Sequence, residues 1–258
     1  MRGWILALSP YSYPIKVNYA KWGESENSQC ACGQSMESFI HLQLSCLLEH
    51  RRNSRQEAHN RVAKIVENCM DNIHGHHRIS VWDKQVITFL HSLEMSRQQT
   101  LLLNALTIEE LGIWKSAIGQ TRTPQQQAGR KRTLDDIKTY FDREDLTKRP
   151  DGMIFDFHHR TIYVIEVART GDSPGSLRNR YLKKTLKYVS MVEGLSFTSC
   201  KVEQITLVIG LLGSIEESRW RQSLEAFGMT RSQQDKLIRR CMVATIEGTH
   251  LVLGVGDT

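Results

Sequence analysis

Long apolar segments are missing from this sequence, and prolines and aromatic residues are few. No apolar run approaches the roughly 18 residues that a membrane-spanning helix needs, and the first apolar stretch is too short for a secretory signal peptide. With 5 prolines, 7% aromatic and 40% hydrophobic residues, the composition is that of an ordinary globular protein. We therefore expect a soluble, intracellular protein with no membrane partner.

The charge balance is moderately basic. Lys and Arg number 34 against 28 for Asp and Glu, which gives a net charge of +6 and a pI near 9.0. This balance permits a polyanionic partner without requiring one. The 258 residues can bury a full core, either as one large domain or as a small module with a medium one.

Hydrophobic spacing divides the chain into a helical first part and an alternating second part. In the first part it predicts helices at 38–50, 51–73, 81–95 and 107–118. In the second part it predicts a hairpin at 150–168, a strand at 203–212, and helices at 176–193, 216–227 and 231–242. Between them, residues 119–133 are polar and Gln-rich. We expect an α/β (α+β) protein with three parts: a zinc-knuckle and helical region at 1–118, a linker or mobile loop at 119–133, and a domain at 134–258.

Three of the six cysteines cluster beside a histidine. The segment “CACGQSMESFIHLQLSC” contains Cys30, Cys32, His41 and Cys46 in the order C-x-C-x8-H-x4-C. In a reducing compartment this grouping favours a metal over disulfides, and zinc takes four such ligands in a tetrahedron. His41 and Cys46 are five residues apart, so the helix must end or bend between them. The alternative is a set of buried cysteines with an incidental histidine.

Two acidic residues stand at the ends of the predicted hairpin, “DGMIFDFHHRTIYVIE”. Facing residues of an antiparallel ladder have a constant index sum, and a tight turn centred on His158 and His159 sets that sum at 317. Asp151 then faces Glu166, with Cβ atoms about 5 Å apart. Two like charges at that distance need a cation, so the pair predicts a Mg²⁺ or Mn²⁺ site suited to phosphodiester hydrolysis.

A structural role is the alternative for both acids. Asp151 would cap the turn after Pro150, and Glu166 would pair with Lys148 or Arg149. However, Glu166 interrupts “IYVIEVA”, a run apolar enough to be buried on both faces of a sheet. A charge at that position needs a reason.

The proline before the first acid and the spacing from Asp151 to Glu166 resemble the PD-(D/E)xK nuclease signature. In that signature a lysine lies two residues after the second acid, where this chain has Ala168. One branch of the superfamily carries the lysine on the following helix, and “RNRYLKKTLKYV” offers Lys184 and Lys187 on one helix face. Both are candidates for the catalytic lysine, and Lys184 is slightly preferred.

The order of these motifs is similar to that in the restriction-like endonuclease region of site-specific non-LTR retrotransposons. That region has a CCHC zinc knuckle, an R/K-P-D motif, a second acid and a K-x-x-K-Y helix, and here the same order spans roughly residues 20–195. The resemblance implies a helical and zinc-knuckle N-terminal part followed by a PD-(D/E)xK nuclease-like mixed sheet flanked by helices. It also implies a metal-dependent DNA endonuclease that nicks target DNA, so that the 3′-hydroxyl primes reverse transcription. No Y-x-D-D polymerase box is present, so the chain resembles the C-terminal part of such an element, or a remnant of one.

In this interpretation Zn²⁺ is structural, Mg²⁺ or Mn²⁺ is catalytic, and the partner is DNA, with RNA as a second candidate. Residues 147–190 contain nine basic residues against four acids, a surplus that suits a phosphate backbone. The residues expected to bind nucleic acid are Arg149, Arg178, Arg180 and Lys183. The basic run “GRKRT” at 129–133 would suit nuclear targeting, and we expect a nuclear protein.

Two other functions fit the same motifs. One is a non-catalytic nucleic-acid-binding protein on a degenerate nuclease fold, which Ala168 favours. The other is a structure-selective nuclease such as a junction resolvase, which has the same fold and acids but would not predict the knuckle.

Overall fold

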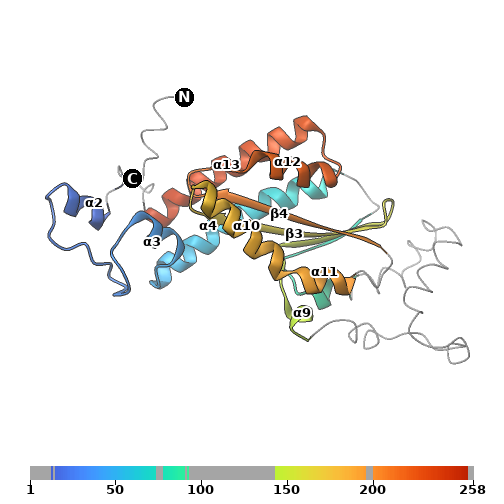
Figure 1. Cartoon of the computed structure of the whole chain (residues 1–258), viewed down its shortest axis with the longest axis horizontal. Helices are drawn as coiled ribbons and strands as arrows, with labels where there is room; N and C mark the ends of the chain where they lie inside the picture. The colour runs from blue at the N-terminus through green and yellow to red at the C-terminus, as the bar shows by residue number, and fades with distance from the viewer. Residues whose placement is uncertain are drawn as a thin grey trace, which may run out of the picture.

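A mixed four-stranded sheet forms the centre of the protein (Figure 1). The computed structural model describes residues 13, 15–73, 78–90, 92, 143–195 and 200–254. The strands, in their order across the sheet, are β1 (Arg78–Trp82), β2 (Gly152–Asp156), β3 (Thr161–Thr170) and β4 (Lys201–Gly210). The β1–β2 and β2–β3 pairs are antiparallel, and β3 and β4 are parallel.

Helices flank the sheet. They are α2 (Lys16–Lys21), α3 (Phe39–Leu44), α4 (Glu49–Asp71), α9 (Arg143–Thr147), α10 (Pro174–Lys187), α11 (Val189–Leu195), α12 (Glu217–Ala226) and α13 (Arg231–Leu253). None of the helices in the described ranges is long and apolar enough to cross a membrane. A mixed sheet flanked by helices confirms the α/β (α+β) class, and the nuclease-type fold stays a prediction.

The two faces of the sheet are covered by different helices. Side chains such as Ile165 and Leu207 pack on α4, α12 and α13, with the buried Trp220 among them. On the opposite face, Ile162 and Val164 pack with the buried side chains of α11. Since β3 is covered on both sides, all of its residues are buried, as its apolar run predicts.

The β2–β3 hairpin has the predicted register. Gly152 pairs with Ile165, and Asp156 pairs with Thr161, so the index sum of 317 is confirmed. The Asp156 carboxylate accepts the backbone N–H of His159 at 3.0 Å, which closes the turn over its own residues.

Several predicted helices end at other residues than expected. The helix predicted at 81–95 is wrong in its first part, because 78–82 forms the edge strand β1 and helical structure starts only at residue 86. The alternation in “RISVW” suits a strand, and pairing with β2 decides its conformation. The helix predicted at 38–50 is interrupted between α3 and α4. The helix at 107–118 and the linker at 119–133 lie outside the described residues.

Segments from both sides of the expected boundary share one core. The strand β1 belongs to the same sheet as β2, and α4 packs against α13. The helices approach so closely that a Cβ added at Gly248 would lie 2.7 Å from the Ala58 Cβ, which only glycine avoids. The Gln43 side chain of α3 donates to the Thr249 carbonyl of α13 at 2.8 Å, and joins the cysteine-rich module to the same core.

Candidate functional site

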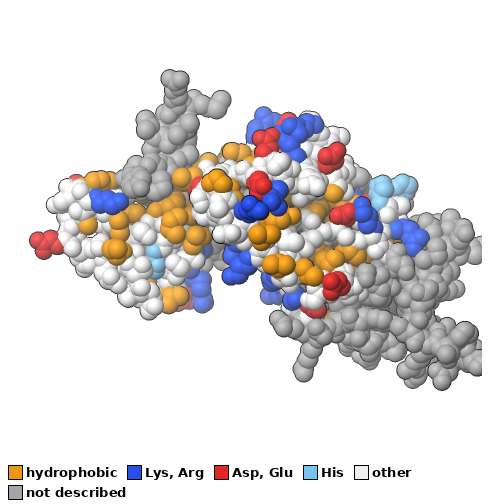
Figure 2. Space-filling model, viewed as in Figure 1, with side chains coloured by type: hydrophobic (Ala, Val, Ile, Leu, Met, Phe, Trp, Pro, Cys, Tyr) orange, Lys and Arg blue, Asp and Glu red, His pale blue; other side chains and the backbone are white. Residues whose placement is uncertain are grey.

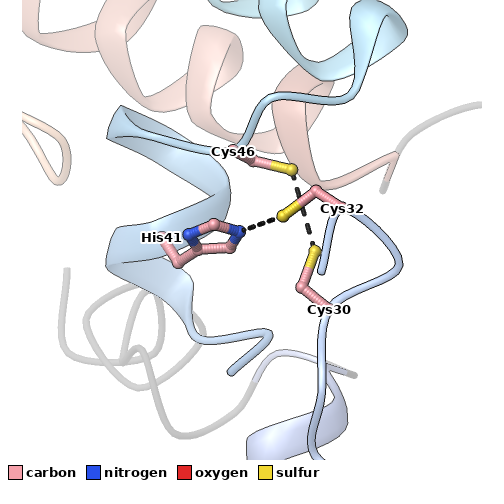
Figure 3. A group of neighbouring side chains, drawn as sticks. All are labelled: Cys30, Cys32, His41 and Cys46. Atoms are coloured by element: carbon pink, nitrogen blue, oxygen red, sulfur yellow. Dashed lines mark hydrogen bonds between the residues drawn. The ribbon is translucent and has the colours of Figure 1, made fainter. Parts of the chain in front are cut away.

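The four predicted zinc ligands converge on one point. Cys30 and Cys32 lie on a loop, His41 on α3, and Cys46 just after it, and their side chains point toward a common centre (Figure 3). One potential ligand atom from each lies within 4.8 Å of all the others. The Cys30 and Cys46 Sγ atoms are 3.7 Å apart. Two thiolates in a tetrahedral site with Zn–S bonds of about 2.3 Å lie about 3.8 Å apart. The cluster could therefore hold zinc.

The backbone around the cluster places these ligands. The Cys46 N–H donates to the His41 carbonyl at 2.8 Å, so the chain turns at the end of α3 and both residues face the same point. This confirms that the helix ends between them. Ser45 Oγ lies 3.3 Å from His41 Nδ1, which leaves Nε2 for the metal. Gly33 has a φ of 73°, in the left-handed region that glycine adopts without strain.

The thiols of the cluster differ in acidity. The backbone N–H of Gln34 lowers the pKa of the Cys32 thiol to about 6. Burial raises the pKa of Cys30 to about 11. Since the thiolate is the ligand form, Cys32 is ready to bind at neutral pH, whereas Cys30 must release its proton to a metal.

The two acidic residues lie at one end of the hairpin. The register sets Asp151, immediately before β2, opposite Glu166 in β3. The Glu166 side chain is 3% exposed and that of Asp151 is 17% exposed. The Asp151 Oδ2 accepts the backbone N–H of Val167 at 2.6 Å, so the neighbouring strand holds one of its oxygens. Within the described chain no third Cys, His, Asp or Glu completes a close ligand set here.

The helix α10 brings Lys184 to Glu166. Ser173 caps the helix by accepting the Ser176 N–H at 3.1 Å, and Pro174 suits its first turn. Near the other end of α10, the Lys184 Nζ contacts Glu166 Oε1 directly. A lysine therefore reaches the second acid from the helix rather than from the strand.

The strand position that lacks a lysine lies under the same helix. Ala168 is 2% exposed and packs with Leu177, Val208 and the partly buried Tyr181. A long charged side chain at 168 would have to displace these apolar groups. The packing of α10 on the sheet thus explains why a small residue occupies this position.

Tyr188 belongs to the same group of side chains around Glu166. Its hydroxyl lies 2.7 Å from Glu166 Oε2 and donates to it, because an ionised carboxylate can only accept. Burial and the neighbouring Glu166 raise the pKa of Tyr188, so it stays a protonated donor. The position of tyrosine directly after the second lysine of K-x-x-K-Y was the one available signal.

Lys187 does not contact Glu166 directly. Its Nζ donates to the Tyr188 hydroxyl at 2.7 Å and lies 4.5 Å from the centre of the same ring. Burial lowers the pKa of Lys187, although Glu166 opposes this shift. Two ammonium groups therefore accompany the two carboxylates, which offsets the cost of burying Glu166.

In the alternative, structural interpretation of the two acids, Glu166 would pair with Lys148 or Arg149, and the structure shows neither pair. Lys148 pairs with Asp145 at 2.6 Å, and Arg149 pairs with Asp83 at 3.2 Å. Both basic residues are therefore engaged elsewhere, and Lys184 is the ion-pair partner of Glu166.

His59 is a further residue that the sequence did not reveal. It lies on α4, and its Nε2 is 3.0 Å from Asp151 Oδ1. The two residues are 92 positions apart in the chain, so no local pattern connects them.

The residues expected to bind nucleic acid come from two segments of the chain. Arg178 and Lys183 are exposed on α10, Arg180 is half-buried on the same helix, and Arg149 is exposed ahead of β2. On the face shown in Figure 2, basic side chains form separate groups with apolar side chains between them. The exposed apolar residues of α10 include Leu186, which is 69% exposed.

Comparisons with known proteins add little to this geometry. No protein-family model matches the sequence, and no curated protein matches it. Among solved structures, an N-terminal domain of a reptarenavirus L protein is similar, with a TM-score of 0.24 and 14% identity over 72% of this chain and 94% of that chain. A TM-score of this size carries no argument about fold or function.

Proposed function

We propose that this protein is a metal-dependent DNA endonuclease of the PD-(D/E)xK type, as in the restriction-like endonuclease region of site-specific non-LTR retrotransposons. The contact between Lys184 and Glu166, opposite Asp151, carries the proposal. A buried acid, a facing acid and a lysine are the three charged parts of that signature. Here the lysine comes from the helix instead of the strand.

Asp151 and Glu166 would hold Mg²⁺ or Mn²⁺, since both offer carboxylate oxygens from facing positions of one hairpin. The bound ion supplies charge neutralisation at the phosphate and a water of lowered pKa. The strand N–H of Val167 orients Asp151, and the Tyr188 hydroxyl orients Glu166.

Lys184 is the residue we expect to face the attacking water or the scissile phosphate. Its ammonium contacts the Glu166 carboxylate. It carries the positive charge that would stabilise a phosphorane-like transition state. In the reaction a water oxygen bonds to phosphorus, the bond from phosphorus to O3′ breaks, and a proton goes to O3′. The products are a 5′-phosphate and the 3′-hydroxyl that primes reverse transcription.

DNA would lie along α10, where Arg178, Arg180 and Lys183 would contact its phosphates, and Arg149 would contact it beside Asp151. We expect the zinc module to be structural and to add nucleic-acid contacts, with RNA as a second ligand. Action on chromosomal target DNA requires nuclear localisation.

A second candidate is a non-catalytic nucleic-acid-binding protein. One observation favours it: both oxygens of Glu166 are engaged, by Lys184 and by Tyr188, which also suits a purely structural buried acid. In that case the nuclease fold would only present the zinc module and α10 to the nucleic acid.

Nicking of supercoiled plasmid in Mg²⁺ or Mn²⁺ separates the two functions. The variants are Asp151→Asn and Glu166→Gln, and Glu225→Gln is the control, because Glu225 is an exposed residue of α12 far from the hairpin in sequence. If the protein is an endonuclease, both acid variants lose nicking but still bind DNA, and the Glu225→Gln control nicks as the wild type does. A wild-type protein that binds DNA in a salt-dependent manner without nicking would establish the binding function instead.

A further inference from the structure

The Asp151 carboxylate is held from two sides. Its Oδ2 accepts the Val167 N–H at 2.6 Å, and its Oδ1 lies 3.0 Å from His59 Nε2. A carboxylate that is ionised has no proton to donate, so Nε2 must carry the proton of this hydrogen bond. The plane of the carboxylate is therefore set by β3 on one side and by α4 on the other.

The part of α4 that carries His59 has little freedom to move. Its neighbours Ala58 and Val62 are fully buried. Ala58 faces Gly248 of α13, where even one added methyl group would come within 2.7 Å of the Ala58 Cβ. A displacement of α4 toward or away from α13 would thus disturb a close-packed contact.

One turn earlier, the same helix is hydrogen-bonded to the segment that carries the Cys/His cluster, which we call the zinc module (residues 30–46). The Arg55 guanidinium donates to the Leu42 carbonyl at 3.1 Å and to the Cys46 carbonyl at 2.7 Å. Arg55 and His59 are four residues apart and share a face of α4. The face of α4 that grips the zinc module is therefore the face that reaches Asp151.

We propose that His59 is a positioning residue, which orients the Asp151 carboxylate so that it and Glu166 can bind one divalent cation. The inference rests on the proposed function and adds a residue that lies outside the nuclease signature. Half-buried His59 and Asp151 have side chains 26% and 17% exposed, so the hydrogen bond is sheltered while Asp151 stays accessible. A rotation of the Asp151 carboxylate away from Glu166 would break its hydrogen bond to His59, which the packing of α4 against α13 holds in place.

The test is Mn²⁺ binding to the zinc-loaded protein without DNA, followed by the EPR signal of free Mn²⁺. The variants are His59→Leu, which removes the donor, and His59→Gln, which keeps an N–H donor. The control is His50→Leu, the same substitution at an exposed position of the same helix. Thermal unfolding of each variant is recorded in parallel.

We expect His59→Leu to weaken Mn²⁺ binding at least about tenfold, as for other residues that orient metal ligands. His59→Gln should restore most of the affinity, and His50→Leu should bind as the wild type does. Rescue by glutamine separates positioning from packing, because leucine fills the space equally well.

Asp151→Asn separates failure of the inference from failure of the proposed function. If Asp151→Asn abolishes Mn²⁺ binding while His59→Leu binds as the wild type does, the role of His59 is overturned and the metal site stands. The role of His59 is also overturned if His59→Gln binds as weakly as His59→Leu. If Asp151→Asn leaves Mn²⁺ binding unchanged, both proposals fall.

Discussion

The Lys184 ammonium of α10 contacts the Glu166 carboxylate of β3, across the interface between the helix and the sheet. Glu166 is one of the most deeply buried charges of the described chain, with a side chain 3% exposed. Burial of a carboxylate costs free energy unless a cation and hydrogen bonds accompany it, and Lys184 and Tyr188 supply both. The same arrangement would give the proposed nuclease its two acids and its lysine.

Replacement of Lys184 should affect nicking far more than replacement of another lysine. We expect Lys184→Met to reduce single-turnover nicking about a hundredfold or more, the usual cost of removing one group that stabilises charge in a transition state. The control is Lys236→Met, at an exposed position of α13. If Lys187→Met abolishes nicking and Lys184→Met does not, the catalytic lysine is Lys187.

A lysine placed on the strand should not substitute for the one on the helix. The Ala168 side chain lies under α10 against Leu177 and Val208, so Ala168→Lys overpacks this contact. We expect a loss of about 1–3 kcal/mol in the free energy of unfolding in urea. The double variant Lys184→Met, Ala168→Lys should stay inactive, and recovered nicking would show that position 168 reaches the acids.

Removal of zinc should make three thiols accessible to solvent. A chelator should make Cys30, Cys32 and Cys46 reactive to iodoacetamide, with Cys32 first, because its pKa of about 6 leaves it mainly thiolate at pH 7. Cys241 is an internal control, since it is fully buried and burial raises its pKa to about 12. Mass spectrometry of the alkylated peptides measures each site. Unchanged reactivity of the three thiols would contradict a zinc site.

Asp156 should stabilise the protein at neutral pH and lose this effect in acid. Burial alone would raise its pKa, but the backbone N–H and ring of His159 and the Arg78 guanidinium lower it to about 2. Since the unfolded value is about 3.9, the stabilisation is complete above pH 4 and disappears as the pH falls toward 2.

We therefore expect Asp156→Asn to lower the free energy of unfolding by roughly 2 kcal/mol or more at pH 7, because Arg78 is left buried without its partner. The difference from the wild type should shrink between pH 4 and pH 2. Urea unfolding at pH 7, 4 and 2.5 measures it, with Glu225→Gln as the control. A difference that is independent of pH would contradict the charge effect.

Local patterns in the sequence predicted much of the candidate site. The apolar run around Glu166 predicted a strand buried on both faces, and the turn at His158 and His159 set the register that places Asp151 opposite it. The pattern of apolar residues along a strand and the pairing register of a hairpin depend only on residues close together in the chain. Both can therefore be predicted without a structure. The spacing of Cys30, Cys32, His41 and Cys46 predicted their cluster for the same reason.

Contacts across the fold were not predictable in this way. The edge strand β1 was not predicted, and its last two residues were assigned to the start of a helix, because five residues of alternating pattern acquire their conformation from pairing with β2. The choice of Lys184 over Lys187 as the partner of Glu166 depends on how α10 is rotated over the sheet, and both lysines share one helix face.

The sequence by itself determined the members of the Cys/His cluster, the register of the hairpin and the helix that carries the lysines, because these follow from spacing along the chain. Only the tertiary structure decided that Lys184 and Tyr188 share Glu166 and that His59 reaches Asp151. These contacts join residues on separate helices and strands, and the packing of α10 and α4 on opposite faces of one sheet brings them together.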